Sequence, residues 1–283
     1  MRAYYNPSTP FSLDHALHYG HGVFETMPCV GDEILLLSEH LERMARGAEI
    51  LDIPFDYDEI LLSINNHLMP SNTASVVKVI LTAGGATRGY GGYWQDKANT
   101  ALNSKQPECQ LLVFQDRFSE RNLLLRECGA RLLLCTTRLG SQPLLAGFKH
   151  LNRLEQVLAS REVVALGADD GVMLDMAGHL VCTTCANLFW VQSGCLYTPD
   201  ISECGIAGVF RKKILDLAAN LDIPTKLVKT FAADLLEADE VFLSNSVRGI
   251  WPVVQVGDSA FHIGELTRLL QSHARPWMAV VSG

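Results

Sequence analysis

The stretch that decides the fold is Ala146 to Leu158, which reads AGFKHLNRLEQVL. After Lys149, leucines recur at positions 151, 154 and 158, which is the spacing of one face of a helix. A lysine becomes a useful amine nucleophile when burial or a neighbouring cation depresses its pKa, and the apolar neighbours of Lys149 allow burial. On composition alone, an exposed lysine is the commoner case. The stretch therefore predicts a helix after Lys149 and leaves the chemical role of this lysine open.

Upstream of this stretch, the chain reads as the strands and helices of a smaller domain. Apolar residues at 41, 44, 48 and 51 recur on one face of a helix that stops before Pro54, and Ser38 can cap its start. The other elements predicted here are a strand at 34–37, a helix at 58–68, a strand at 76–82, a loop at 84–92 and a strand at 110–114.

Two polar segments mark the end of this domain. Residues 93–108 show no period, and they read either as a mobile loop near a pocket or as a surface insertion. The charged segment 115–122 is typical of a connection between domains. We therefore expect a smaller N-terminal α/β domain at 1–115, a linker at 116–122 and a larger C-terminal domain at 123–283.

The C-terminal half contains many short strands and few helices. Strands are predicted at 131–137, 172–174, 188–192, 226–230, 240–244 and 253–256, and apolar residues at 210, 214, 217 and 221 mark a helix that ends by Pro224. This pattern predicts two α+β domains rather than one regularly alternating sheet. A pocket between two such domains is an ordinary place for catalysis.

Composition narrows the class of partner. Hydrophobic residues make up 48% and charged residues 19%, an ordinary globular balance. The net charge of −8 argues against a nucleic-acid binder, although a few arginines in one pocket can still attract small anions. The chain has no secretory signal core, and no apolar run approaches the roughly 20 residues that span a bilayer. We expect a cytoplasmic protein with a small-molecule substrate and without nucleic-acid or membrane partners.

The eight cysteines include one CxxC pair, Cys182 and Cys185. Such a pair can be a redox couple or half of a zinc site. No second CxxC or histidine pair follows at zinc-finger spacing, and no thioredoxin-like context surrounds it. Coincidence is the better reading, and no metal site is expected.

Three features can bind an anion, although none of them is specific alone. Residues 205–208 read GIAG and open a helix near Val209, where glycines permit close approach and the first N–H groups lack partners within the helix. Ser244 to Ser246 offer short polar groups at the end of a strand, which hold a phosphate or simply close a turn. Arg43 lies within a predicted helix and points either inward to an anion or outward to solvent.

Taken together, these segments resemble a known family. The lysine segment 146–158 resembles the active-lysine segment of 4-amino-4-deoxychorismate lyases, which are fold-type IV pyridoxal 5'-phosphate (PLP) enzymes related to branched-chain and D-amino-acid aminotransferases. The resemblance extends over nearly the whole chain in the correct order. Its further segments are YGHGVFET at 19–26, the arginine segment at 37–43, RGY at 88–90, ANLFW at 186–190, the turn at 205–211 and the last strand and turn at 240–253.

The resemblance implies a two-domain fold of the D-amino-acid aminotransferase type, with the active site at the domain interface and a homodimeric assembly. Lys149 would carry PLP as a Schiff base and would move protons during catalysis. The cofactor phosphate would bind the groups that resemble the family's phosphate site, and two further residues would lie on segments that line the active site. The phosphate ligands would be Arg43, the amides of Ile206 and Ala207, and Ser246, and Thr26 and Tyr90 would line the active site as catalytic candidates beside Lys149.

Three positions depart from the family pattern. Cys182 stands where the family has a glutamate that keeps the pyridine nitrogen protonated, and a thiol is only a weak donor there. His21 replaces a frequent aspartate, and Pro28 replaces an arginine that contacts a substrate carboxylate in some lyases. Arg88 or Arg248 is a candidate substitute for that contact.

The implied activity is conversion of 4-amino-4-deoxychorismate, an amino-chorismate, to 4-aminobenzoate and pyruvate in folate biosynthesis. Cys182 disfavours transamination, which relies on a long-lived carbanion, more than an elimination that ends in an aromatic ring. Two alternatives stay open: an aminotransferase for D- or branched-chain amino acids, and a PLP-binding homologue with weak or altered activity.

Overall fold

The computed structural model describes residues 2–5, 14–69, 73–85, 89–100 and 109–279. The chain divides into two compact units. The first comprises Met1–Arg117 and Phe148–Asn152, and the second comprises Phe118–Gly147 and Arg153–Gly283. The segment that carries Lys149 therefore belongs to the N-terminal unit, although most of the chain around it belongs to the C-terminal one.

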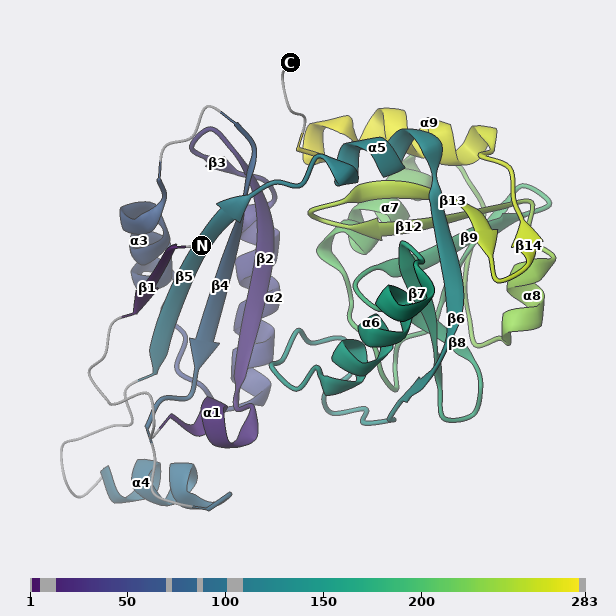
Figure 1. Ribbon diagram of the computed structural model, residues 1–283. Helices are drawn as coiled ribbons and strands as arrows, with labels where there is room; N and C mark the ends of the chain where they lie inside the picture. Colours follow the sequence, from purple (N-terminus) through teal and green to yellow (C-terminus); the bar gives the residue numbers. More distant parts are fainter. Residues whose placement is uncertain (1, 6–13, 70–72, 86–88, 101–108, 280–283) are drawn as a thin grey trace. The chain divides into compact units, whose positions relative to one another are not determined.

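The N-terminal unit is built on a five-stranded antiparallel sheet with the order β1-β5-β4-β2-β3 (Figure 1). In the central part of β2, side chains alternate between a buried and a half-buried face. The buried face contributes to one core with the apolar face of α2. The strands are β1 (Arg2–Tyr5), β2 (Gly22–Val30), β3 (Glu33–Ile34), β4 (Ser75–Thr82) and β5 (Gln110–Arg117), and the helices are α1 (His15–Tyr19), α2 (Leu37–Ile50), α3 (Tyr57–His67) and α4 (Gly92–Thr100).

Two local predictions for this unit were wrong. The strand expected at 34–37 ends at Ile34, because Leu36 adopts a left-handed conformation with φ of 58° and starts α2 at Leu37. Ser38 consequently lies inside the first turn, where its hydroxyl donates to Glu39 instead of capping the helix.

Helix α4 was not predicted, because it occupies part of a segment whose sequence shows no periodicity. Tertiary contacts account for it, since Tyr93 is buried and its hydroxyl donates to the Asp52 carbonyl oxygen at 2.8 Å. Lys97 forms an ion pair with the Asp52 carboxylate at 2.6 Å. The alternatives of mobile loop and surface insertion for 93–108 fall partly outside the described residues.

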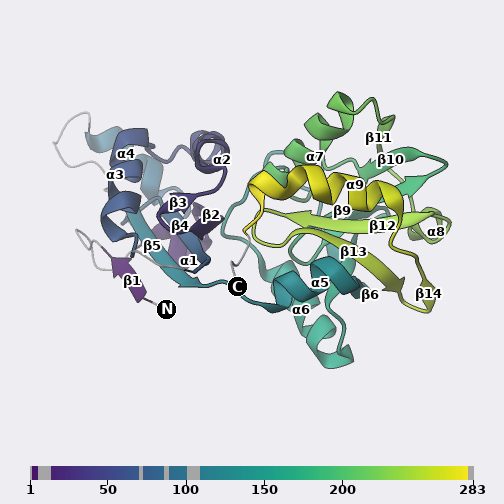
Figure 2. The same cartoon turned by 90° about the horizontal axis from the view of Figure 1, so that it is seen from above.

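The C-terminal unit is a nine-stranded mixed sheet with the order β11-β10-β9-β12-β13-β6-β7-β8, and β14 pairs with β13. Helices α7 and α9 pack on β12, α9 also packs on β13, and α6 packs on β6 and β7 (Figures 1 and 2). The strands are β6 (Ala130–Leu139), β7 (Asp170–Asp175), β8 (Leu180–Thr183), β9 (Asn187–Gln192), β10 (Cys195–Pro199), β11 (Thr225–Val228), β12 (Glu240–Asn245), β13 (Gly249–Val256) and β14 (Ser259–Ala260). The helices are α5 (Arg121–Cys128), α6 (Leu154–Leu166), α7 (Val209–Asn220), α8 (Ala232–Leu236), α9 (Glu265–Ala274) and the 3-10 turn η2 (Arg275–Trp277).

All six strands predicted for this half are present, and the α+β class is confirmed. Strands β8, β10 and β14 were not predicted, because each is short and β8 is buried on both faces. The helix after the lysine starts at Leu154 and excludes Leu151, whose N–H donates to the Gly22 carbonyl oxygen. In the region 115–122, β5 continues to Arg117 and α5 begins at Arg121.

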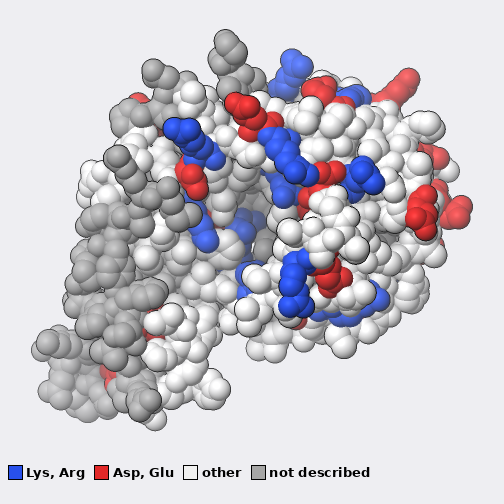
Figure 3. All heavy atoms as spheres, in the orientation of Figure 1, with Lys and Arg blue, Asp and Glu red and all other residues white. Residues whose placement is uncertain are grey.

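Acidic and basic side chains are interspersed over the visible face of the C-terminal unit (Figure 3). Within the described parts of the chain, no helix is both long and apolar enough to cross a bilayer.

Candidate active site

The lysine segment is held by the edge of β2. The Phe24 N–H donates to the Lys149 carbonyl oxygen at 2.9 Å, and Val23 forms an antiparallel bridge with His150. Together with the Leu151–Gly22 hydrogen bond, these contacts add residues 149–151 to the sheet as a short extra strand. The sheet thereby fixes the backbone of Lys149, although this residue lies in the connection between β6 and α6.

The Lys149 side chain lies over an aromatic ring. Its Nζ is 4.0 Å from the centroid of the Phe24 ring, a cation–π distance, and the residue is half-buried. Thr26 follows Phe24 by two positions on β2 and therefore faces the same side of the sheet. Two of the three predicted catalytic residues thus share one face of this unit.

Tyr90, the third predicted catalytic residue, is 78% exposed, and its ring lies 4.9 Å from that of Tyr19. The Gly89 N–H donates to the Tyr19 hydroxyl at 3.2 Å. Helix α1 therefore supports the described part of this loop.

Arg43 is buried on α2 in an ion pair that was not predicted. Its Nε donates to Glu25 Oε1 at 2.8 Å, and its Nη2 donates to Glu25 Oε2 at 2.5 Å. His40 Nδ1 lies 2.6 Å from the same Oε2. Burial alone would raise the pKa of Glu25, but the Arg43 cation and the hydrogen bonds from His40 and Arg43 outweigh it and hold the pKa at about 2. Burial lowers the pKa of His40, so a neutral imidazole donates its Nδ1–H to an ionised Glu25.

This cluster fixes the orientation of the arginine predicted to bind phosphate. A planar guanidinium held by two parallel hydrogen bonds cannot rotate without breaking both. The sequence contained a usable signal, because His40 and Arg43 are three residues apart and lie on one face of α2. The partner carboxylate on β2 was the part that the helix spacing did not reveal.

In the C-terminal unit, the turn at 205–208 pairs with the residues before the lysine segment. Gly147 donates its N–H to the Gly205 carbonyl oxygen and accepts from the Ala207 N–H, both at 3.0 Å. Gly205 has a φ of +91°, and a Cβ there would approach Val181 Cγ1 to 2.8 Å, so glycine is required. The Asn187 amide donates to the Ile206 carbonyl oxygen at 2.8 Å and ties the turn to β9.

The groups predicted for the phosphate therefore differ in availability. The Ala207 N–H already donates to Gly147, whereas the Ile206 N–H has no acceptor within the described residues. The Ser246 hydroxyl is buried and lacks a partner in the same part of the chain. Ser244, which pairs with Asn187 across β12 and β9, has a buried Oγ with no hydrogen bond to a described residue.

Cys182 lies in β8, only 7% exposed, in a small core that includes Cys135 and Cys204. Burial raises the pKa of Cys182 far above its usual range, with the neighbouring Arg153 cation opposing the shift, so the side chain is a neutral thiol. All eight cysteines lie in the described residues, and none forms a disulfide.

Comparison with known proteins decides the family. A profile described as amino-transferase class IV matches residues 22–256. The chain belongs to the aminotransferase class IV family. It is 34% identical to an aminodeoxychorismate lyase from Vibrio harveyi, over 94% of this chain and 96% of that one. It is 26% identical to the branched-chain-amino-acid aminotransferase of Escherichia coli strain K12, over 92% and 84% of the two chains.

A solved structure agrees with this assignment. The crystal structure of 4-amino-4-deoxychorismate lyase from Pseudomonas aeruginosa matches with a TM-score of 0.83 and 36% identity, covering 97% of this chain and 98% of that one. The predicted resemblance to the lyases and to fold-type IV enzymes is confirmed.

Arg248, a candidate for a substrate carboxylate in this class IV protein, is engaged elsewhere. Its Nη1 donates to the buried Asp170 carboxylate at 2.7 Å, and its guanidinium lies 4.2 Å from the Trp251 ring centroid. The other candidate, Arg88, lies outside the described residues.

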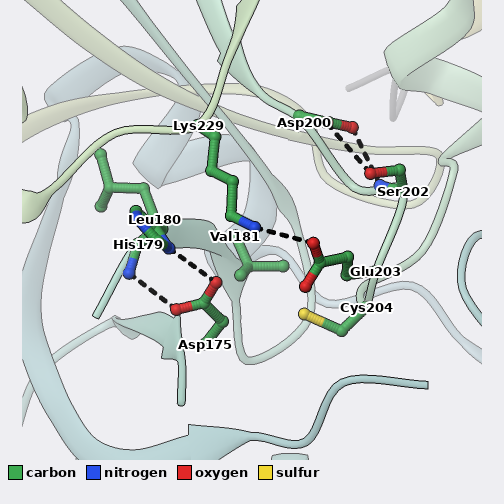
Figure 4. Close-up of a pocket in the computed structure, with 9 residues that line it drawn as sticks. All are labelled: Asp175, His179, Leu180, Val181, Asp200, Ser202, Glu203, Cys204 and Lys229. Atoms are coloured by element: carbon green, nitrogen blue, oxygen red, sulfur yellow. Dashed lines mark hydrogen bonds and ion pairs between the residues drawn. The ribbon is translucent and has the colours of Figure 1, made fainter. Parts of the chain in front are cut away.

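A small hollow lined mainly by polar residues lies beside the start of the turn at 205–208 (Figure 4). Its wall contains paired side chains: Lys229 donates to Glu203 at 2.8 Å, Ser202 donates to Asp200 at 3.0 Å, and His179 lies 2.9 Å from Asp175. The Lys229–Glu203 pair joins two separate segments and ties the chain that leads into the turn to the segment after β11, whereas the other two pairs are local. Within the described residues, no cluster of three or more acidic, histidine or cysteine side chains forms a metal site.

Proposed function

We propose that this class IV protein is a PLP-dependent lyase that converts 4-amino-4-deoxychorismate to 4-aminobenzoate and pyruvate. The observation that carries the proposal is that two lyases match the chain over nearly its full length at 34% and 36% identity, above the 28% and 26% of two branched-chain aminotransferases. The neutral thiol of Cys182 supports the same choice, because it is a poor partner for the protonated ring nitrogen on which transamination relies.

The chain's own groups fit a phosphorylated aldehyde cofactor. Lys149 supplies the amine, on a backbone fixed by β2. The Ser246 hydroxyl and the Ile206 N–H, both without described partners, are suited to a phosphate oxygen at the start of α7. Arg43 supplies a fixed cation, and Ala207 joins the phosphate ligands if its N–H exchanges its bond to Gly147.

When bound, PLP supplies the electron sink for the bond-breaking step. Lys149 would hold the cofactor through its amine and, as a free amine, would remove the ring proton of the substrate and return it to the departing enolpyruvyl group. Cys182 would face the ring nitrogen and would offer it only a weak hydrogen bond. Thr26 and Tyr90 line the substrate side in this proposal, and Thr26 shares its face of the sheet with Lys149.

The test is an absorbance spectrum of the purified protein with PLP, recorded before and after addition of 4-amino-4-deoxychorismate while pyruvate is assayed. We expect a PLP–lysine band and release of both products. Lys149→Ala should remove the band and the activity. Lys78→Ala is the matched control, because Lys78 Nζ also lies over the Phe24 ring, at 5.0 Å, and this variant should retain the band.

Two results contradict parts of the proposal. A band without pyruvate would exclude the lyase, and conversion of the cofactor to its amine form by D- or branched-chain amino acids would then identify an aminotransferase. Absence of any lysine-dependent band would overturn the role of PLP itself.

A cytoplasmic homodimer completes the proposal. Helix α6 exposes apolar side chains along one stripe, with Leu154 76%, Val157 60% and Leu158 45% exposed. A second copy of the chain is the occupant we infer for this stripe, because exposed apolar patches on one helix face are typical of interfaces. Sedimentation analysis should give a dimer, and Leu154→Glu should shift it toward monomer; a monomeric parent protein would refute this part.

A further inference from the structure

Asp170, at the start of β7, is a buried carboxylate with an unusually large number of donors. Its Oδ1 accepts from the Gly171 N–H at 2.8 Å and from the Thr184 N–H and hydroxyl at 3.1 and 2.6 Å. Its Oδ2 accepts from the Thr183 hydroxyl at 3.1 Å and the Cys185 thiol at 3.2 Å. One carboxylate therefore holds the whole turn that separates Cys182 from β9.

Arg248 connects this carboxylate to a second turn. Its Nη1 donates to Asp170 Oδ2 at 2.7 Å, and its own backbone N–H donates to Asn245 Oδ1 at 2.6 Å. The Asn245 amide in turn donates to the Cys185 carbonyl oxygen at 2.9 Å. The turn at 245–248, which contains Ser246, is thus bound to the turn at 183–186 directly through Asn245 and Cys185, and indirectly through Arg248 and Asp170.

The burial of the pair makes this connection rigid. The Asp170 side chain is fully buried, and that of Arg248 is 22% exposed and stacked on Trp251. A buried carboxylate that loses its cation is strongly destabilised, so the two turns cannot separate without a large penalty. Neither residue is among the cofactor ligands proposed above, and the Arg248 guanidinium is already engaged with Asp170 and Trp251.

We propose that Asp170 and Arg248 are positioning residues that hold the Cys182 turn and the Ser246 turn in one fixed arrangement, so that the ring nitrogen and the phosphate of PLP are recognised together. This inference rests on the proposed function for its ligand. The tie between the turns is a property of the chain itself and is measurable without cofactor.

The first measurement is hydrogen exchange of the apo protein. Asp170→Asn should increase exchange at 183–187 and 245–249 together. Arg248→Lys keeps the positive charge but removes the planar guanidinium that stacks on Trp251, and it serves as the milder variant. Glu240→Gln is the matched control, because Glu240 is another carboxylate of this unit that accepts three hydrogen bonds, from Leu266 and Thr267, away from both turns.

The second measurement compares the affinities for PLP and for pyridoxal, which lacks the phosphate. Loss of one hydrogen bond to a charged group should weaken PLP binding about tenfold more than pyridoxal binding. Glu240→Gln should leave the ratio of the two affinities unchanged, whereas a general loss of stability would lower both alike. The double variant Asp170→Asn/Arg248→Lys should be no worse than the more affected of its two single variants, because each change breaks the same tie.

The outcomes separate this inference from the proposed function. If the parent protein does not bind PLP but Asp170→Asn raises hydrogen exchange at both turns, the connection between the turns is confirmed. The assignment of PLP as the ligand is then wrong. Exchange that rises at one turn alone, an unchanged ratio of PLP to pyridoxal affinity, or multiplicative effects in the double variant would overturn the positioning role.

Discussion

The buried Glu25 carboxylate should contribute strongly to the stability of the N-terminal unit, and Glu25→Gln tests this. The pKa of Glu25 falls from 4.5 to about 2 in the folded protein. Since one pKa unit corresponds to about 1.4 kcal/mol, ionised Glu25 adds roughly 3 kcal/mol to the free energy of unfolding. Removing one partner of a buried ion pair typically costs about 3–5 kcal/mol, which agrees with this figure.

The pH dependence gives the experiment a second signature. A carboxyl whose folded pKa is depressed stabilises the protein fully above the unfolded value of 4.5, and the contribution disappears as the pH falls toward about 2. Glutamine does not titrate. The difference between parent and variant should therefore be roughly 3 kcal/mol at neutral pH and should shrink steadily below about pH 4.5.

Urea unfolding followed by circular dichroism measures the free energy, and hydrogen exchange of the amides of α2 locates the effect in the N-terminal unit. Glu42→Gln is the matched control, because Glu42 is exposed on the same helix and should change stability by less than about 0.5 kcal/mol. A loss below about 1 kcal/mol at neutral pH, or a difference that stays constant down to pH 3, would refute the reasoning.

Three further changes test other parts of the structure. In Gly208→Ala the new Cβ overlaps the Asn187 amide oxygen, so thermal unfolding should show a loss of about 1–3 kcal/mol; an unchanged midpoint would contradict the close approach. Cys182→Glu buries a carboxylate, so the apo protein should be less stable by a few kcal/mol. With PLP the same variant should convert the cofactor to its amine form faster in the presence of amino acids, and an unaltered rate would argue against a role at the ring nitrogen. Tyr93→Phe removes the hydrogen bond to Asp52 and should lower the free energy of unfolding by about 1 kcal/mol in urea, whereas a neutral result would remove this explanation of α4.

Much of the fold was predictable because it is encoded by local periodicity. The apolar residues at 41, 44 and 48 predicted α2, and the run of β-branched residues at 76–82 predicted β4. Both patterns report which face of an element is buried, and burial of that face is the main driving force for the element. The lysine segment was also readable, since it is contiguous and long enough to identify the family.

Sequence alone also fixed which residue types the site contains, but only tertiary structure decided their partners. Glu25 and Arg43 are 18 positions apart, and Asp170 and Arg248 are 78 apart. Such pairs depend on strand register and helix packing, which determine the positions of whole sets of side chains together. They leave no periodic pattern in the sequence around either residue. For the same reason the spacing did not reveal that the Ala207 amide is already bonded to Gly147, or that the segment carrying Lys149 joins the edge of β2. Local periodicity follows from burial of one face, whereas hydrogen-bond partners are chosen only when distant segments meet.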